Sequence, residues 1–136
     1  MTVALVGYSG TPLAKKLSLK DGLTAWFYKM PASVRAEIGE VRLIERSAPE
    51  PGLDTAHFFV TERAAMERLL GELRHTIAHG GFVWVSWPKK ASKVPTDITE
   101  DTIRAVCLPM GWVDVKVCAV DAIWSGLKLM IRKDLR

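Results

Sequence analysis

Apolar residues recur with two different spacings along this chain. Between positions 61 and 79 they are three or four residues apart, and charged residues fill the intervals. The apolar positions are Met66, Leu69, Leu70, Leu73 and Ile77. This spacing predicts a helix that begins at Thr61 and ends at Gly80. Residues 82–87 are almost all apolar or aromatic, which predicts a central strand covered on both faces.

The same two patterns continue towards the N-terminus. Residues 24–30, 41–45 and 55–60 are rich in β-branched, aromatic or aliphatic side chains and predict strands. Residues 12–19 and 31–38 each begin at or beside a proline, which is favoured in the first helical turn, and predict short helices. Strands and helices therefore alternate through the first half of the chain.

The C-terminal third predicts one more helix and two strands. Asp97 and Glu100 have the spacing of a capping box, so a helix is expected to begin there. Residues 113–119 and 127–131 alternate between apolar and polar side chains, as half-buried strands do. The connection at 121–126 is short enough for a β-hairpin.

This order of elements predicts the α/β class. Alternating strands and helices imply a mostly parallel sheet with right-handed crossovers, closed by an antiparallel C-terminal hairpin. We expect residues 1–136 to form a single Rossmann-like domain, a three-layer sandwich. Its predicted core contains Leu69, Leu73, Val83, Val85, Val115, Val117, Leu129 and Ile131.

Composition narrows the class of protein. With 49% hydrophobic and 25% charged residues, the chain is typical of a globular domain. Uninterrupted apolar runs such as 82–85 are far shorter than the roughly 20 residues that cross a bilayer, and the N-terminus lacks the charges of a signal peptide. We therefore expect a cytoplasmic protein that does not bind membranes. Cys107 and Cys118 have no metal or redox spacing and are expected to be reduced core residues.

The net charge of +4 affects the choice of partner. Lysines gather at 15–29, 89–93 and 128–136, and a basic balance attracts anions. Solvated lysine faces explain these groups more simply than nucleic acid does. The sequence favours an anionic small molecule as partner and leaves the oligomeric state open.

Three segments are candidates for a ligand site. Open α/β sheets bind ligands at the carboxyl ends of their strands, and this rule brings 7–11, 86–93 and 121–126 to one edge. These segments offer backbone donors, hydroxyl groups, aromatic rings and ammonium groups. The candidate residues are Tyr8, Ser9, Gly10, Thr11, Ser86, Trp87, Lys89, Lys90, Ser92, Trp124 and Ser125.

Known catalytic motifs do not fit these segments. The turn at 7–11 is neither a P-loop nor a nucleophile elbow, since Thr11 stands where the elbow has its last glycine. His75 and His79 are four residues apart on the predicted helix, but Thr76 replaces the glutamate of a zinc-protease motif. The sequence therefore assigns no catalytic residue, no metal and no cofactor.

Two resemblances add to this picture. One is carried by GYSGTPLAKKL (7–17), WVSWPKKAS (84–92), TDITE (96–100) and VDVKVCAVDAIWSGL (113–127). In combination these segments resemble a family of small bacterial proteins classed as a domain of unknown function, which implies a fold but no activity. The order of elements over 54–133 also resembles the second half of the class I S-adenosylmethionine-dependent methyltransferase fold.

The sequence departs from the methyltransferase pattern where the cofactor would bind. A glycine-rich turn is needed after the first strand, because only glycine lets the backbone approach the ligand closely. Here that strand is followed by Lys29-Met30-Pro31-Ala32, although Glu45 matches the acidic position that holds ribose hydroxyls. The sequence favours a binding or regulatory module without catalysis of its own. An enzyme acting on a nucleotide or phosphorylated metabolite, and a weak nucleic-acid binder, stay open as alternatives.

Overall fold

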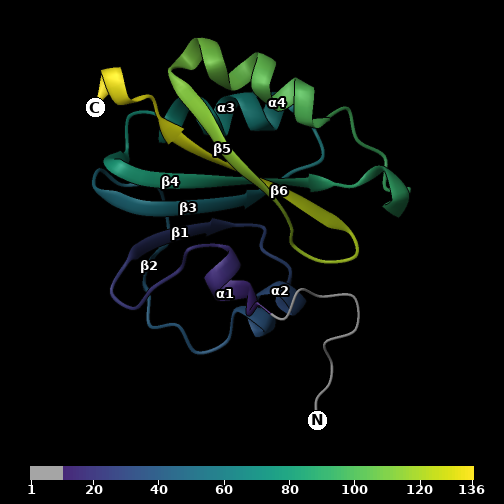
Figure 1. Ribbon diagram of the computed structural model, residues 1–136, viewed down its shortest axis with the longest axis horizontal. Helices are drawn as coiled ribbons and strands as arrows, with labels where there is room; N and C mark the ends of the chain where they lie inside the picture. Colours follow the sequence, from purple (N-terminus) through teal and green to yellow (C-terminus); the bar gives the residue numbers. More distant parts are fainter. Residues whose placement is uncertain (1–10) are drawn as a thin grey trace.

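The computed structural model describes residues 11–136, in which six strands form one mixed sheet (Figure 1). In chain order the strands are β1 (Thr24–Tyr28), β2 (Ile44–Arg46), β3 (Leu53–Phe59), β4 (Ile77–Pro88), β5 (Trp112–Ala119) and β6 (Trp124–Ile131). Across the sheet their order is β2-β1-β3-β4-β6-β5. β1 to β4 are parallel, and β6 runs antiparallel to both β4 and β5. The predicted mostly parallel sheet with an antiparallel C-terminal hairpin is confirmed.

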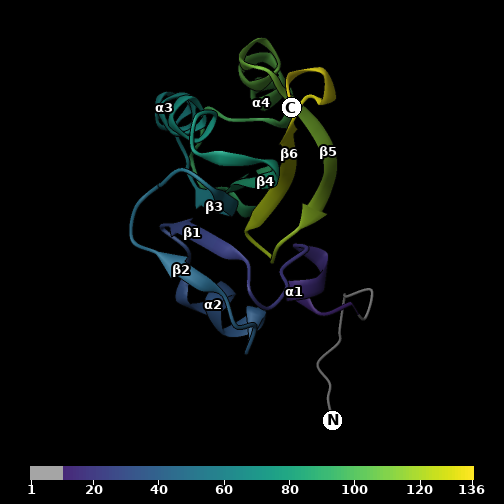
Figure 2. The same cartoon turned by 90° about the vertical axis from the view of Figure 1, so that its left-hand side faces the viewer.

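Helices cover both faces of the sheet (Figure 2). One face carries α3 (Arg63–Leu73) and α4 (Glu100–Cys107), and the opposite face carries α1 (Leu13–Lys16) and α2 (Ala32–Ile38). The 3-10 turns are η1 (Lys90–Ser92), η2 (Leu108–Met110) and η3 (Lys133–Leu135). The sheet between two helical layers is the predicted three-layer arrangement. Within residues 11–136, none of the helices is long and apolar enough to cross a membrane.

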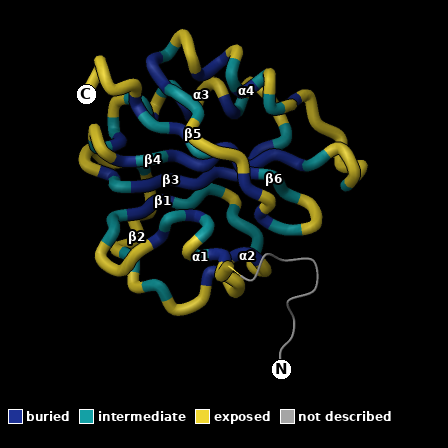
Figure 3. The backbone as a smooth tube through the Cα atoms, in the orientation of Figure 1, coloured by how far each residue is buried: buried dark blue, intermediate teal, exposed yellow. Residues whose placement is uncertain are grey.

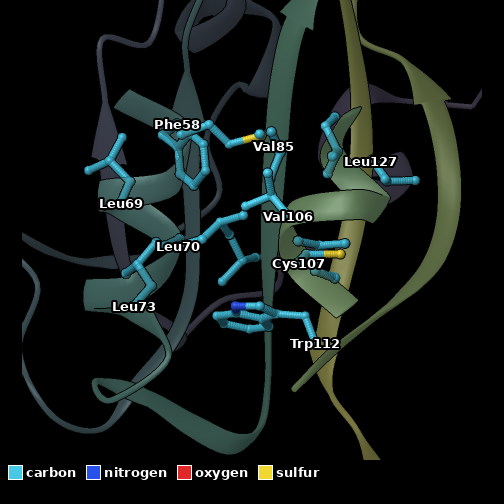
Figure 4. Packing of buried hydrophobic residues seen from close by; sticks show 14 of the residues in the cluster. Phe58, Leu69, Leu70, Leu73, Val85, Val106, Cys107, Trp112 and Leu127 are labelled. Carbon is cyan, nitrogen blue, oxygen red and sulfur yellow. The ribbon is translucent and has the colours of Figure 1, made fainter. Parts of the chain in front are cut away.

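A hydrophobic core lies on each side of the sheet. The α3/α4 core includes Phe58, Leu69, Leu70, Leu73, Val85, Val106, Trp112 and Leu127 (Figure 4). The α1/α2 core includes Leu13, Leu17, Val34, Ile38, Phe59 and Trp84. Strand β4 serves both cores, because successive strand residues point to opposite faces: Val83 and Val85 to the first, Trp84 to the second. The buried middle of the sheet is visible in Figure 3, and β4 is covered on both faces as predicted.

The predicted helix over 61–79 is too long. α3 ends at Leu73, and Ile77 is the first residue of β4. Ile77 fits the helical stripe by spacing, but it pairs with Leu53 of β3, and the backbone N–H groups of Gly52 and Leu53 bond the carbonyl of Thr76 at 2.9 and 3.2 Å. These sheet contacts decide the conformation. Consequently His75 lies in a turn and His79 in a strand, so they do not share a helix face.

Gly80 and Gly81 lie inside β4 instead of ending a helix. The β3–β4 pairing shifts register between Leu53 and Thr55, whose partners are Ile77 and Phe82. The two glycines lie in the irregular stretch between these partners. A Cβ atom added to Gly81 would clash with the backbone of Asp54 in β3.

We expect Gly81→Ala to destabilise the protein and Gly80→Ala to be tolerated. A Cβ atom on Gly81 would lie 2.6 Å from the carbonyl oxygen of Asp54, whereas one on Gly80 would have no heavy atom of the described residues within 4 Å. Gly81→Ala should lower the free energy of unfolding by about 1–3 kcal/mol, and Gly80→Ala should change it by less than about 0.5 kcal/mol. Urea denaturation measures both, and equal losses would contradict this description of the bulge.

The prediction that Val115 and Val117 are buried is wrong. Their side chains are 47% and 49% exposed, while the other six predicted core residues are buried. β5 is an edge strand, and its pairing with β6 shifts register between Asp114 and Lys116. The extra residue interrupts the alternation on which the prediction depended.

The start of α4 also differs from the prediction. The hydroxyl of Thr99 accepts the backbone N–H of Thr102 at 3.2 Å, so Thr99 is the N-cap. Asp97 instead accepts the backbone N–H of Arg63 at 2.7 Å, at the first residue of α3. A carboxylate there satisfies one of the free donors of a helix end. Asp97 therefore ties the loop before α4 to the start of α3.

Candidate functional site

The carboxyl ends of β1 and β3 form a topological switch point. β1 pairs with β2 on one side and with β3 on the other. The helix after β1, α2, lies on one face of the sheet, and the helix after β3, α3, lies on the opposite face (Figures 1 and 2). Chain segments leave the two neighbouring strand ends in opposite directions, which opens the crevice where α/β sheets bind ligands.

A cleft of about 280 Å³ lies at this place. Its lining residues are Tyr28, Lys29, Phe59, Val60, Thr61, Glu62, Ala65 and Trp124. We call it the switch-point cleft. The lining comes from the ends of β1 and β3, the first turn of α3 and the first residue of β6.

Aromatic rings and two opposite charges define the chemistry of the switch-point cleft. Trp124 packs edge-on against Phe59, with ring centroids 5.2 Å apart and an interplanar angle of 87°. The ammonium group of Lys29 lies 5.5 Å from the centroid of the Tyr28 ring. Glu62, the residue before α3, contributes a carboxylate to the lining. Such a cleft can hold a flat ring and contact a charged substituent on it.

The turn after β1 has an unusual backbone. Lys29 has a φ of 55°, in the left-handed region where a glycine would be least strained. Pro31 follows, and its carbonyl accepts the N–H groups of Val34 and Arg35, both at 3.0 Å, as α2 begins. The turn therefore adopts a glycine-like conformation at Lys29 while carrying a long side chain, and Pro31 provides no backbone donor.

Glu45 is held by an ion pair. Its carboxylate accepts two hydrogen bonds from the guanidinium of Arg35, at 2.8 and 3.0 Å. This bond is the main reason why the pKa of Arg35 lies above its ordinary value. In the sheet Glu45 is level with Ala25, well before β1 ends at Tyr28. The carboxylate is thus engaged by α2 instead of lining the switch-point cleft.

A second cleft, of about 500 Å³, lies beyond the end of β4. Its lining residues are Trp87, Pro88, Lys90, Lys93, Val94, Pro95, Thr96, Ile98, Thr99 and Glu100, and we call it the loop cleft. Ser92 shapes this loop: its hydroxyl donates to the carbonyl of Lys89 at 2.7 Å and accepts the N–H of Val94 at 3.2 Å. Ser92 therefore organises the loop from within.

The structure brings two of the three predicted segments together. The N–H of Lys89 bonds the carbonyl of Ile123 at 2.8 Å, and Ser125 pairs with Trp87 across β4 and β6. However, Trp87 packs in the α3/α4 core and Trp124 against the α1/α2 core, and the two tryptophans line different clefts.

Of the third predicted segment, only Thr11 lies within the described residues. It comes two residues before α1 begins at Leu13. Tyr8, Ser9 and Gly10 are outside the described residues, and the part assigned to them stays a prediction.

Ser86 is fully buried and bonds His57. The hydroxyl lies 2.7 Å from Nε2 of His57, whose ring stacks on Phe59 with centroids 4.4 Å apart. Burial lowers the pKa of His57 to about 3, so the imidazole is neutral at physiological pH. Since Ser86 and His57 are both enclosed, this pair ties β3 to β4 in the interior.

Sequence reasoning missed Tyr28, Lys29 and Glu62. The predicted strand over 24–30 extends past the end of β1 at Tyr28, so Tyr28 and Lys29 were placed inside a strand and not at the edge where ligands bind. The sequence singles out Lys29 for its charge and for occupying the place of a glycine, and Thr61 as a helix cap. The residues that follow the carboxyl ends of two neighbouring strands, compared as a pair, indicate where the switch-point cleft lies.

The sequence has no match among family models and no significant match among curated proteins. Its structure is similar to a S-adenosylmethionine-dependent methyltransferase from Aquifex aeolicus, with 14% identity, a TM-score of 0.66 and 88% of each chain covered. It is also similar to precorrin-6y C5,15-methyltransferase from Geobacter metallireducens, with 11% identity, a TM-score of 0.55, and 97% of this chain and 93% of that chain covered. A TehB-like methyltransferase from Corynebacterium glutamicum has 8% identity and a TM-score of 0.54, with 93% and 90% covered.

The chain therefore has the fold of class I S-adenosylmethionine-dependent methyltransferases. Resemblance was expected only over 54–133, but the likeness to the Aquifex aeolicus structure covers 88% of the chain. The part before residue 54 contains β1 and β2, which extend the same sheet: β1 pairs with β3, and β2 pairs with β1. At these identities the likeness concerns the fold alone.

Proposed function

We propose that this chain is a binding module on a methyltransferase-like fold, whose ligand is a small planar anion held in the switch-point cleft, and that it transfers no methyl group. The observation that carries the proposal is the cleft at the carboxyl ends of β1 and β3, with Trp124 and Tyr28 as aromatic side chains and Lys29 as the cation. An aromatic carboxylate combines a flat ring with a charge that Lys29 can bind. The proposal extends to a regulatory role through that ligand.

Three features argue against S-adenosylmethionine as the ligand. The turn after β1 carries the Lys29 side chain and Pro31 where the cofactor needs close access to the backbone. The Glu45 carboxylate is bound to Arg35. The cleft volume of about 280 Å³ lies below the range of roughly 300–1,000 Å³ that is usual for sites of larger ligands. A single-ring compound fits this volume better than a nucleoside carrying an amino acid.

Calorimetric titration with benzoate and with S-adenosylmethionine tests the proposal. We expect benzoate to bind with a dissociation constant of about 1 mM or tighter, since a compact ligand gains most per atom from one charge contact and one stacked ring. Lys29→Gln should weaken that binding at least about tenfold, because it removes a charge-assisted hydrogen bond. S-adenosylmethionine should not bind in the low-micromolar range.

Lys90→Gln is the matched control, because it makes the same charge change in the loop cleft. It should leave benzoate binding unchanged. If Lys90→Gln weakens binding and Lys29→Gln does not, the ligand belongs to the loop cleft and the proposed site is wrong. If neither lysine matters, the anion preference itself fails.

A methyltransferase-like enzyme acting on a nucleotide or phosphorylated metabolite is the second candidate. The likeness to methyltransferase structures over most of the chain favours it. Low-micromolar binding of S-adenosylmethionine in the same titration would support this candidate and overturn the non-catalytic proposal.

A further inference from the structure

Two lysines face each other directly across the terminal hairpin. Lys116 of β5 is paired in register with Lys128 of β6. Side chains at such positions start about 4.5–5.5 Å apart, and like charges placed there destabilise a sheet. The repulsion between Lys116 and Lys128 therefore lowers the stability of the hairpin.

Helix α1 lies beside the hairpin (Figure 2), and hydrogen bonds join Lys16 in α1 and the nearby Ser18 to the hairpin. The ammonium group of Lys16 donates to the carbonyl of Ala119 at 3.0 Å, and that of Lys128 donates to the hydroxyl of Ser18 at 3.0 Å. Lys128 also lies 4.6 Å from the centroid of the Phe82 ring, so its aliphatic stem covers the α1/α2 core. We call Lys16, Lys116 and Lys128 the lysine cluster.

The charges of the lysine cluster shift the pKa values of neighbouring side chains. The pKa of Lys128 lies below its ordinary value, first because the side chain is partly buried and second because Lys116 repels its charge. Lys16 and Lys116 both favour the thiolate of Cys118, although burial raises the pKa of that thiol overall. The positive potential of the lysine cluster is therefore concentrated on one small region.

Within residues 11–136, no carboxylate forms an ion pair with any member of the lysine cluster. Residues 1–10 contain no Asp or Glu that could do so. Ser18, the partner of Lys128, has a φ of 61°, a left-handed conformation that is costly for a residue other than glycine. Strained backbone is concentrated at functional sites, and proteins also break local electrostatic rules at such sites.

We infer that the lysine cluster binds the adjacent phosphoryl groups of a small polyphosphate. Phosphoryl oxygens accept charge-assisted hydrogen bonds from several ammonium groups at once and would remove the repulsion between Lys116 and Lys128. Along β5 the distance from Lys116 to Ala119, where Lys16 is anchored, is about 10 Å for three residues. Lysine side chains can bridge part of that separation, and linked phosphoryl groups offer the three ammonium groups more oxygens and more negative charge than one phosphate does. This site is separate from the switch-point cleft and does not depend on the function proposed for it.

Lys116→Gln tests the inference with pyrophosphate as the probe. The substitution removes one of two facing charges, so the free protein should melt about 1–4 °C higher at low salt. The same substitution should weaken pyrophosphate binding, measured by calorimetry, at least about tenfold. A gain in stability together with a loss of binding is a combination that a merely structural lysine would not produce.

Lys133→Gln is the control, because it makes the same charge change at an exposed position in η3. It should alter neither the melting temperature nor pyrophosphate binding. Orthophosphate, which offers fewer oxygens and less negative charge, should bind more weakly than pyrophosphate. The inference is overturned if pyrophosphate does not bind, if Lys116→Gln binds it as well as the parent protein, or if Lys133→Gln weakens it equally. Binding of a short RNA without pyrophosphate binding would also overturn it.

Discussion

Leu73→Ala should lower the free energy of unfolding by about 2–5 kcal/mol. Leu73 is fully buried at the end of α3, beside Leu69 and Leu70 in the α3/α4 core (Figure 4). Removing its branched side chain loses the transfer free energy of the buried groups and leaves a cavity that a packed core fills only partly. Urea denaturation monitored by tryptophan fluorescence measures the loss.

Val117→Ala is the matched control for Leu73→Ala. Val117 is 49% exposed on the edge strand β5, so truncating it should change the free energy of unfolding by less than about 0.5 kcal/mol. A loss below about 1 kcal/mol for Leu73→Ala would contradict the placement of α3 against the sheet. A large loss for Val117→Ala would show that β5 is covered in solution.

The sequence predicted a helix or strand correctly where the spacing of apolar residues fits only one of the two. The stripe from Met66 to Leu73 is helical because its spacing and its charged neighbours agree, and β4 is a central strand because both of its faces are apolar. The sequence does not predict where α3 ends. Ile77 satisfies both the helical spacing and a strand, and its pairing with Leu53, distant in sequence, decides between them.

The edge strand shows a different limit. Alternation at Val113, Val115 and Val117 indicates one buried face, but the bulge between Asp114 and Lys116 adds a residue to one strand only. A bulge depends on the register of both strands, so a single strand pattern does not reveal it. Val115 and Val117 are exposed because β5 is the last strand of the sheet, and the sequence of one strand does not reveal the strand order.

The order of elements predicts the edge of the sheet at which Trp124 lies, but not which side chains share a cleft there. Trp124 does lie at the carboxyl ends of β1 and β3, as the rule for α/β sheets requires. Trp87 is one position away from the residue paired with Trp124, and one position along a strand reverses the face. Whether two side chains share a cleft therefore depends on register, which the order of elements leaves undetermined.

His57 should make the protein sensitive to acid between pH 7 and pH 3. Its pKa is about 3 in the folded protein, against 6.5 for the exposed group, because burial disfavours the charged form. Below pH 6.5 the unfolded chain therefore binds a proton that the folded protein does not. The stability that a neutral His57 provides is complete above pH 6.5 and is lost as the pH falls towards 3, by about 2 kcal/mol at pH 5.

His57→Gln separates this effect from general acid denaturation. Glutamine can still bond the Ser86 hydroxyl, which lies 2.7 Å from Nε2, but it does not titrate. Its free energy of unfolding should be lower at pH 7 and nearly independent of pH from 7 to 5, whereas His79→Gln, at an exposed position, should keep the parent slope.

Asp114, held ionised by Arg104, has a pKa below its ordinary 3.8 and so affects stability only at lower pH. An unchanged slope in His57→Gln would show that His57 is hydrated or mobile in solution, because a fully enclosed imidazole must oppose protonation.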